Sequence, residues 1–263
     1  MLFYELLNVI SPLEKACPIL KIIVFCLIAF VSILYSVSGL LFPPKEAILD
    51  INKKTQLVIK QGDVMKAQGV KVIPVNEYFD THLGDGIVNE KSLHGQFLKC
   101  YDGKIKELRE QIDKKLDSLE PLPSNRTRTL VTGLPQRRYP LGSCVKISDG
   151  ESCFLLVAVT RFNKNEHVDV STEEFPEVIR KMFNGIEQLH DGMPVFLPLI
   201  GSGLSGYDLT NMQIMYIIVQ AAQLANRLSL SNGVYLYIYG EKQMKSINLN
   251  VIKYLYNRWK KLK

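Results

Sequence analysis

The feature that most constrains the fold of this chain is a run near its beginning without any charged side chain. The run extends from Ile22 to Pro44 and reads IIVFCLIAFVSILYSVSGLLFPP. A helix needs about 20 apolar residues to cross the hydrocarbon of a bilayer, and this run is long enough. Two prolines end it, since proline does not continue a helix comfortably. We therefore predict a membrane segment over residues 1–44, with the span at about 19–42.

A signal peptide and a buried core helix are the other interpretations of this run. A signal peptide combines a basic beginning with a shorter apolar stretch, whereas here Glu5 and Glu14 accompany Lys15 and Lys21 before a longer run. Residues 1–16 are apolar but too short to cross unaided, so they form either an interfacial helix or half of a hairpin with the span. Lysines flank the span on both sides, and their distribution mildly favours a cytoplasmic location for the remainder.

The charges of the remainder describe a mildly basic soluble domain. The chain carries 32 Lys and Arg and 26 Asp and Glu, of which two of each sign lie in residues 1–44, so the net charge of +6 belongs to the rest. Its lysines are scattered apart from RWKKLK at the end, which does not indicate nucleic-acid binding. The cysteines show no paired motif, which favours a reducing compartment without disulfides or zinc. They are Cys17, Cys26, Cys100, Cys144 and Cys153.

Apolar strands alternate with helical patterns along the rest of the chain, which predicts βαβ units and a largely parallel, mixed sheet. Thr172 followed by acids indicates a helix beginning, and an irregular basic segment occupies 121–142. We place one α/β domain at 55–263. Its strands are expected at 55–63, 70–76, 152–160, 193–201 and 233–240, and its helices at 96–119, 171–190, 209–228 and 244–263. The expected buried stripe of the last helix is Ile247, Val251, Tyr254, Leu255 and Trp259.

Three loops that follow predicted strands have unusual compositions. The first contains Gly62-Asp63-Val64, the second runs from Asn76 to Gly95, and the third reads GSGLSG from Gly201 to Gly206. Ligands of open α/β sheets bind beyond the carboxyl ends of the strands. Glycines before a helix expose backbone N–H groups to an anion, and the helix N-terminus favours negative charge. The third loop is therefore a candidate phosphate-binding loop, and plain tight turns are the alternative.

Taken together, the three loops resemble those of a macro domain. The resemblance rests on Gly62-Asp63-Val64, on the apolar strand VIPVN ending at Asn76, and on GSGLSGY, and it covers roughly residues 55–263. It implies a three-layer α/β/α sandwich with a mixed, largely parallel sheet. It also implies a cleft that binds ADP-ribose or a derivative of it.

The loop after Asn76 departs from the usual macro-domain pattern of an Ala-Asn pair followed by glycines. Its spelling, with SLHGQF after it and an apolar segment before the domain, resembles the membrane-anchored, ThsA-type effectors of type II Thoeris anti-phage systems. That resemblance implies a partner TIR-domain enzyme, which makes an NAD-derived signal of the histidine–ADP-ribose type. It also implies a homo-oligomer that acts on membrane lipid and leads to abortive infection. The location it implies is the inner membrane of a bacterium, with the macro domain facing the cytoplasm.

The resemblance also assigns roles to residues. Asp63 would accept a hydrogen bond from the adenine amino group, with Val64 packing beside it, and Asn76 would lie near the distal ribose. The alternative for Asp63 is that it caps a turn. Tyr239 would stack on adenine, or would pack in the fold like its alternating neighbours. The pyrophosphate would be held by Gly201, Ser202, Gly203, Leu204, Ser205, Gly206 and Tyr207.

The divergent loop supplies further candidate ligand contacts. If the ligand carries an extra amine or imidazole, acidic groups here would receive it, and the alternative for each is a solvated loop residue. These candidates are Glu77, Phe79, Asp80, Asp85 and His94.

We expect a sensor without catalytic residues, resident cofactor or metal. No Ser-His or Cys-His pair has a spacing typical of a catalytic site, and the other histidines do not have the spacing of ligands. A membrane-tethered ADP-ribosyl hydrolase is the alternative, because a fold does not determine function. In that alternative Asp80 and Asp85 would position a water. A third interpretation is an anchor that only localises an ADP-ribose reader.

Overall fold

The computed structural model of the chain describes residues 18–41, 44–123, 127–128, 131–163, 165, 167–201, 203, 206–225 and 228–261. The chain divides into two compact units, Met1–Pro44 and Lys45–Lys263.

The first unit contains one described helix, α2, from Pro18 to Leu41. Its window Pro18–Tyr35 has a mean hydropathy of 2.5, and none of that window is buried, whereas the core helix of a soluble protein is mostly buried. Length and composition suffice for this helix to cross a membrane, although a signal sequence near an N-terminus would pass the same test. Residues 1–16, which we expect to form an interfacial helix or a second crossing, lie outside the described residues.

The second unit is built on a seven-stranded sheet with the order β1-β2-β7-β6-β3-β5-β4. The five central strands are parallel, and β1 and β4 are antiparallel to their neighbours, which confirms the mixed, largely parallel sheet. The predicted start of the domain at 55 leaves out β1, and β4 was not predicted either. The strands are β1 Glu46–Asp50, β2 Gln56–Gln61, β3 Val70–Asn76, β4 Cys144–Asp149, β5 Ser152–Thr160, β6 Val195–Pro198 and β7 Val234–Ile238.

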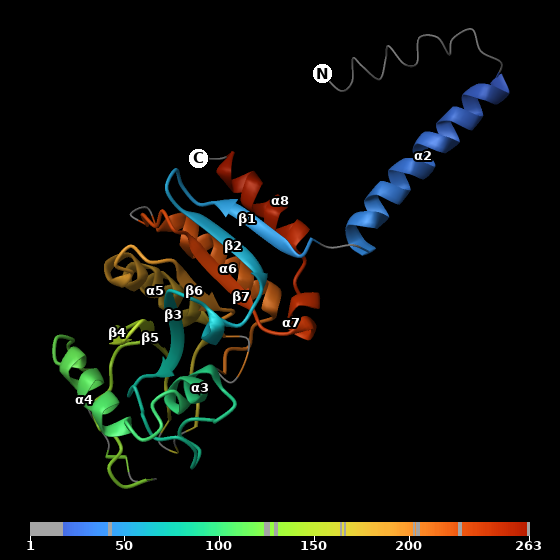
Figure 1. Ribbon diagram of the computed structural model, residues 1–263. Helices are drawn as coiled ribbons and strands as arrows, with labels where there is room; N and C mark the ends of the chain where they lie inside the picture. Colours follow the sequence, from blue (N-terminus) through green and yellow to red (C-terminus); the bar gives the residue numbers. More distant parts are fainter. Residues whose placement is uncertain are drawn as a thin grey trace. The chain divides into compact units, whose positions relative to one another are not determined.

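Helices cover both faces of the sheet and complete three layers (Figure 1). Helices α5 (Phe175–Leu189), α6 (Asn211–Leu224) and α8 (Leu249–Lys260) share one hydrophobic core with six strands. Helices α3 (Leu93–Lys99) and α4 (Ile105–Leu116) share a second core with β3, β4 and β5. Shorter helical turns are η2 (Val64–Lys66), η3 (Thr172–Glu174) and α7 (Glu241–Lys245).

Two helix predictions need correction. The helix predicted at 96–119 is two helices, because the chain turns at Cys100–Lys104, where Gly103 has a φ of +75°. The first of them begins earlier than predicted, at Leu93, because the Ser92 hydroxyl accepts the Gly95 N–H at 3.0 Å. Ahead of α5, Ser171 rather than Thr172 is the capping residue, and it forms a capping box with Glu174.

The predicted buried stripe of the last helix is wrong for Val251 and Tyr254, whereas Ile247 is buried and Leu255 and Trp259 are partly buried. Helix α8 begins only at Leu249, so Ile247, which is buried, precedes it. The buried residues inside α8 are Leu249, Ile252 and Tyr256, which repeat at i, i+3 and i+7, whereas Val251 and Tyr254 are 40% and 59% exposed. Periodicity identified an amphipathic helix, but which side of α8 is buried depends on the strand against which it packs.

Candidate ligand-binding cleft

A cleft of about 1080 Å³ lies at the carboxyl ends of the parallel strands. Asn76 ends β3, Thr160 ends β5 and Pro198 ends β6, and all three line it. The remaining walls come from residues 86–89 and 91–94, from the loops after β5 and β6, and from Tyr239, Lys242, Gln243 and Ser246. This is the end of an α/β sheet at which ligands bind.

The described residues that line this cleft include no carboxylate. Its charged side chains are Lys91 and Lys242, and two histidines, His94 and His167, accompany them. The cleft is therefore suited to an anion, such as a pyrophosphate, rather than to a cation.

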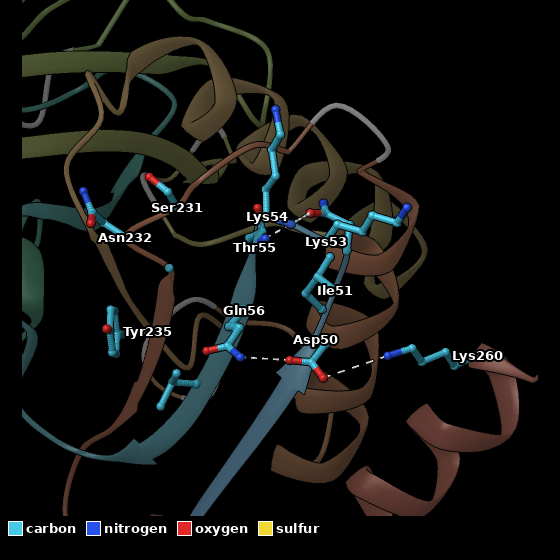
Figure 2. Close-up of a pocket in the computed structure, with 13 residues that line it drawn as sticks. Asp50, Ile51, Lys53, Lys54, Thr55, Gln56, Ser231, Asn232, Tyr235 and Lys260 are labelled. Atoms are coloured by element: carbon cyan, nitrogen blue, oxygen red, sulfur yellow. Dashed lines mark hydrogen bonds and ion pairs between the residues drawn. The ribbon is translucent and has the colours of Figure 1, made fainter.

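A second hollow, of about 750 Å³, lies at the opposite end of the sheet, where β2 and β7 begin (Figure 2). Its polar side chains engage one another: Gln56 Nε2 donates to Asp50 Oδ1 at 2.9 Å, and Lys260 Nζ lies 4.0 Å from Asp50 Oδ2. We assign the candidate site to the cleft, because it stands at the carboxyl ends of the strands.

The glycine-rich loop forms part of the cleft wall through Gly201 and Gly203. Gly201 has a φ of +93°, and a Cβ there would lie 3.0 Å from the Phe175 ring. A Cβ at Gly203 would meet no heavy atom of the described chain within 4 Å. Ser202, Leu204 and Ser205, which we expect to join the phosphate loop, lie outside the described residues.

The end of this loop is anchored to the core rather than open to the cleft. Gly206 has a φ of +78°, and a Cβ there would lie 2.5 Å from Val168. The Tyr207 hydroxyl donates to the Val159 carbonyl at 2.8 Å, and its ring packs at 4.7 Å on Phe175. Burial raises the pKa of Tyr207. Tyr207 is thus placed to support the loop and is not among the residues that line the cleft.

Asn76 lines the cleft with its amide held in one orientation. Its Oδ1 accepts from the backbone N–H groups of Tyr78 and Asp80 at 3.1 and 3.3 Å, and its Nδ2 donates to Asp80 Oδ2 at 2.9 Å. A primary amide has two N–H donors. Asn76 can therefore offer its second N–H to a ligand without giving up these bonds.

Asp80 does not face the cleft, because it is fully buried in an ion pair with Arg128. The guanidinium binds both carboxylate oxygens, at 2.8 and 2.9 Å, and stacks 3.9 Å from the centre of the Tyr78 ring. Both side chains are 0% exposed. The sequence placed Arg128 in an irregular basic segment, 48 residues away, where no local pattern identifies its partner.

Glu77 and Phe79 are also buried and are absent from the cleft lining. Glu77 Oε1 accepts from the Phe162 N–H at 3.1 Å, which ties the loop after β3 to the loop after β5. Phe79 has a φ of +52°, belongs to the second core, and its carbonyl accepts from Arg109 Nη1 at 2.8 Å. The composition of this loop suggested ligand contacts, whereas these side chains hold the loop in place.

Asp85 and His94 lie in different surroundings. Asp85 is exposed, has a φ of +49°, and binds His82 Nε2 at 2.8 Å on the surface. His94 lines the cleft and is 7% exposed. Of the five candidates in the divergent loop, the structure brings only His94 to the cleft.

Burial makes His94 a pH-sensitive element of the cleft. Burial lowers its pKa from 6.5 to about 4, and a hydrogen bond with the Asp80 backbone acts in the opposite direction. The unfolded chain binds a proton near pH 6.5. The stability that depends on neutral His94 is therefore fully present above that pH and is lost as the pH falls toward 4.

Between about pH 8 and pH 5 we expect this loss to reach about 2 kcal/mol. His94→Gln should remove it, as measured by urea unfolding of the full chain in micelles at the two pH values. His82→Gln, which replaces a histidine on the surface, should show the same decrease in the free energy of unfolding between these pH values as the unaltered chain. A pH dependence that survives His94→Gln would contradict the assignment.

The Gly62-Asp63-Val64 triplet lies beside the cleft instead of lining it. Asp63 Oδ1 accepts the Met65 N–H at 3.0 Å and caps η2, and Val64 is buried. A Cβ at Gly62 would lie 2.5 Å from the ring of Tyr237, which does line the cleft. Glycine is therefore needed here for the close approach of Tyr237.

Tyr239 lines the cleft and is 71% exposed, so it does not pack in the fold. Its neighbour Tyr235 stacks on Phe196 at 4.8 Å instead. Within the described residues, no three His, Cys, Asp or Glu side chains converge so as to hold a metal ion.

The fold agrees with comparisons to known proteins. The family model described as "Thoeris protein ThsA, Macro domain" matches residues 57–238. The Thoeris protein ThsA of Bacillus amyloliquefaciens (strain Y2) is 28% identical over 218 residues, which are 81% of this chain and 71% of that protein.

Solved structures show the same fold. The Oceanobacillus iheyensis macrodomain with MES bound superposes with a TM-score of 0.57 at 15% identity, over 81% of this chain and 98% of that one. The same macrodomain with ADP superposes with a TM-score of 0.55 at 16% identity, over 81% and 97%. These matches confirm the macro-domain fold predicted from the three loops. The chain belongs to the family of Thoeris ThsA proteins that is defined by this macro domain.

Proposed function

We propose that this chain is a membrane-anchored anti-phage effector whose macro domain senses an ADP-ribose conjugate derived from NAD. A partner TIR-domain enzyme makes the conjugate, of the histidine–ADP-ribose type, during infection. Binding favours a homo-oligomer in which the membrane segment disrupts the inner membrane and leads to abortive infection. The protein itself carries out no reaction, and the macro domain faces the cytoplasm.

The observation that carries this proposal is the cleft. It stands at the carboxyl ends of the strands, has lysines but no carboxylate among its described lining residues, and includes two glycines of the GSGLSG loop. Such a surface suits a pyrophosphate bound mainly by backbone N–H groups. The related fold from Oceanobacillus iheyensis has been solved with ADP and, as a mutant, with ADPR.

The membrane role rests on α2 and on the family. The helix is 24 residues long, most of its described apolar side chains between Ile19 and Tyr35 are exposed, and its only charged residue is Lys21. In this proposal the cleft binds the ligand, and the helix on the same short chain acts on the membrane.

The described contacts limit which part of the divergent loop can respond to a ligand. Residues 76–80 are held by the Arg128 ion pair, and α3 begins at Leu93. Residues 81–91 therefore form the segment that closes over the ligand in our proposal. A ligand shifts such an equilibrium only by its differential affinity for the two states, and a change from 1% to 99% active needs about 5.5 kcal/mol, shared among subunits.

The ligand is tested with the full chain in micelles. Its melting temperature should rise with a histidine–ADP-ribose conjugate, and less with ADP-ribose or NAD, because a ligand that binds only the native state stabilises it. No shift with any of the three would remove the ligand-binding proposal. Turnover of the conjugate, followed by mass spectrometry, would favour the tethered ADP-ribosyl hydrolase instead.

The output is tested with a chain that lacks residues 1–44. We expect this chain to keep the ligand-induced rise in melting temperature and to lose protection of cells against phage. Protection by the shortened chain would overturn the membrane mechanism while leaving the sensor intact.

A further inference from the structure

Helix α8 has an outward surface that its packing in the core does not explain. We call it the α8 outer face and define it by Val251, Tyr254, Arg258, Trp259 and Lys261. Tyr254 is 59% exposed and Val251 is 40% exposed, whereas the core uses the separate stripe of Leu249, Ile252 and Tyr256. Trp259 is only partly buried, with its ring 4.8 Å from Tyr216 of α6. The helix thus carries apolar side chains on two sides, a buried stripe and a partly exposed one.

The charged side chains within α8 and α6 have one sign. Residues 249–261 contain four cations and no acid, and the neighbouring helix α6 contains no charged residue. Tyr254, Arg258 and Lys261 repeat at i, i+4 and i+7, so they share one side of the helix. Arg258 Nη1 donates to the Tyr254 hydroxyl at 3.3 Å. Exposed aromatic rings beside Lys and Arg are typical of helices that lie in a membrane interface.

The position of α8 in the chain's connectivity favours a membrane as its partner. Helix α8 packs along β1, where the Tyr256 hydroxyl donates to the Asp50 carbonyl and Lys260 reaches the Asp50 carboxylate (Figure 2). Only residues 42–45 separate the end of α2 from β1. Four residues span at most about 14 Å when extended. If α2 is embedded in a bilayer, as the proposed function requires, this short connection keeps the beginning of β1 near the lipid surface and leaves α8 within reach of it.

We propose that the α8 outer face binds the surface of a bilayer that contains anionic phospholipids. Arg258 and Lys261 contact the headgroups, and Val251, Tyr254 and Trp259 enter the interface. This contact holds the macro domain against the membrane and rests on the membrane anchoring proposed above.

Trp259 is the chain's one tryptophan, so its fluorescence reports on this face alone. The full chain is reconstituted in vesicles of phosphatidylcholine alone, or of phosphatidylcholine and phosphatidylglycerol in equal parts, both with brominated acyl chains. We expect bromine to quench Trp259 strongly in the anionic vesicles and weakly in the neutral ones. R258E/K261E should lower the equilibrium constant for docking by at least about 30-fold, since each cation lost near an anionic surface costs about a factor of five and the added carboxylates are repelled.

K114E/K115E is the matched control, because it makes the same charge change on α4, which packs on β4 at the other edge of the sheet, and should keep the quenching. Y254S is a second test, which removes an exposed ring without changing charge and should weaken the quenching. Equal quenching in both vesicles, or quenching that survives R258E/K261E, would overturn the proposal. The proposal would also be overturned if the emission of Trp259 changed with the protein-to-lipid ratio, because this would indicate that a second copy of the chain covers the α8 outer face.

Resistance of the chain to extraction from the vesicles by alkaline carbonate separates the two levels of the proposal. A chain that resists extraction while Trp259 stays unquenched overturns docking and leaves the anchoring in place. A chain that is extracted overturns the anchoring, and docking with it.

Discussion

Arg128→Met should lower the free energy of unfolding by about 3–5 kcal/mol, the cost of leaving a buried carboxylate without its partner. Asp80 is 0% exposed and receives two hydrogen bonds from Arg128, so removal of the guanidinium leaves an uncompensated charge. Urea unfolding of the full chain in micelles, followed by circular dichroism, measures the change. The double variant Arg128→Met/Asp80→Asn should recover part of the loss, because no buried charge then remains.

The matched control is Arg137→Met, which removes an arginine that pairs with Asp117 on the surface. The side chains of that pair are 71% and 70% exposed, so we expect the free energy of unfolding to change by less than about 1 kcal/mol. Equal effects of the two single substitutions would contradict a buried structural role for Arg128. The ligand should also bind Arg128→Met more weakly, since the same ion pair holds the loop that orients Asn76.

Gly203→Val should weaken binding of ADP-ribose at least about 100-fold while leaving the fold intact. Gly203 lines the cleft, and a Cβ there meets no described atom within 4 Å, so the added side chain occupies ligand space instead of protein. Displacing a pyrophosphate from one or two backbone N–H groups loses about 3 kcal/mol, because bonds to charged groups contribute about 1.5–3 kcal/mol each. That loss corresponds to about two orders of magnitude in Kd, measured by titration calorimetry.

Gly203→Ala provides a graded comparison and should reduce the affinity less than valine does. Gly201→Val serves as the contrasting variant. It should lower the melting temperature as well, because Gly201 has a φ of +93° and Phe175 lies 3.0 Å from its added Cβ. An unchanged affinity for Gly203→Val would rule out our placement of the phosphates.

Several elements of the site follow from local sequence alone. Strand ends at Asn76 and before Gly201 are marked by an apolar run that stops at polar or glycine residues, and parallel strands bring their carboxyl ends to one edge. Asn76, Gly201 and Tyr239 line the cleft as this argument predicts. The apolar helix α2 also follows from composition, since no charge interrupts residues 22–44.

The partners of the charged residues do not follow from local sequence. Glu77, Asp80 and Asp85 look alike as acids in one loop, yet the first two are buried and Asp85 lies on the surface. The difference comes from Arg128 and Phe162, which approach from distant parts of the chain. The cleft consequently has lysines where the loop's composition suggested acids.

The same distinction between local sequence and tertiary packing holds for the helices and strands outside the site. Spacing at 3.6 residues identifies α8 as amphipathic, and continuous apolar runs identify the central strands, because these patterns depend only on neighbours along the chain. Which side of α8 is buried depends on β1, a strand about 200 residues earlier that periodicity did not predict. The pattern of residues along the chain thus determined which helix or strand contains a side chain and whether that side chain lies at a strand end. Its burial and charge partner were chosen by long-range contacts, because desolvation and ion pairing depend on whatever else reaches the same point in space.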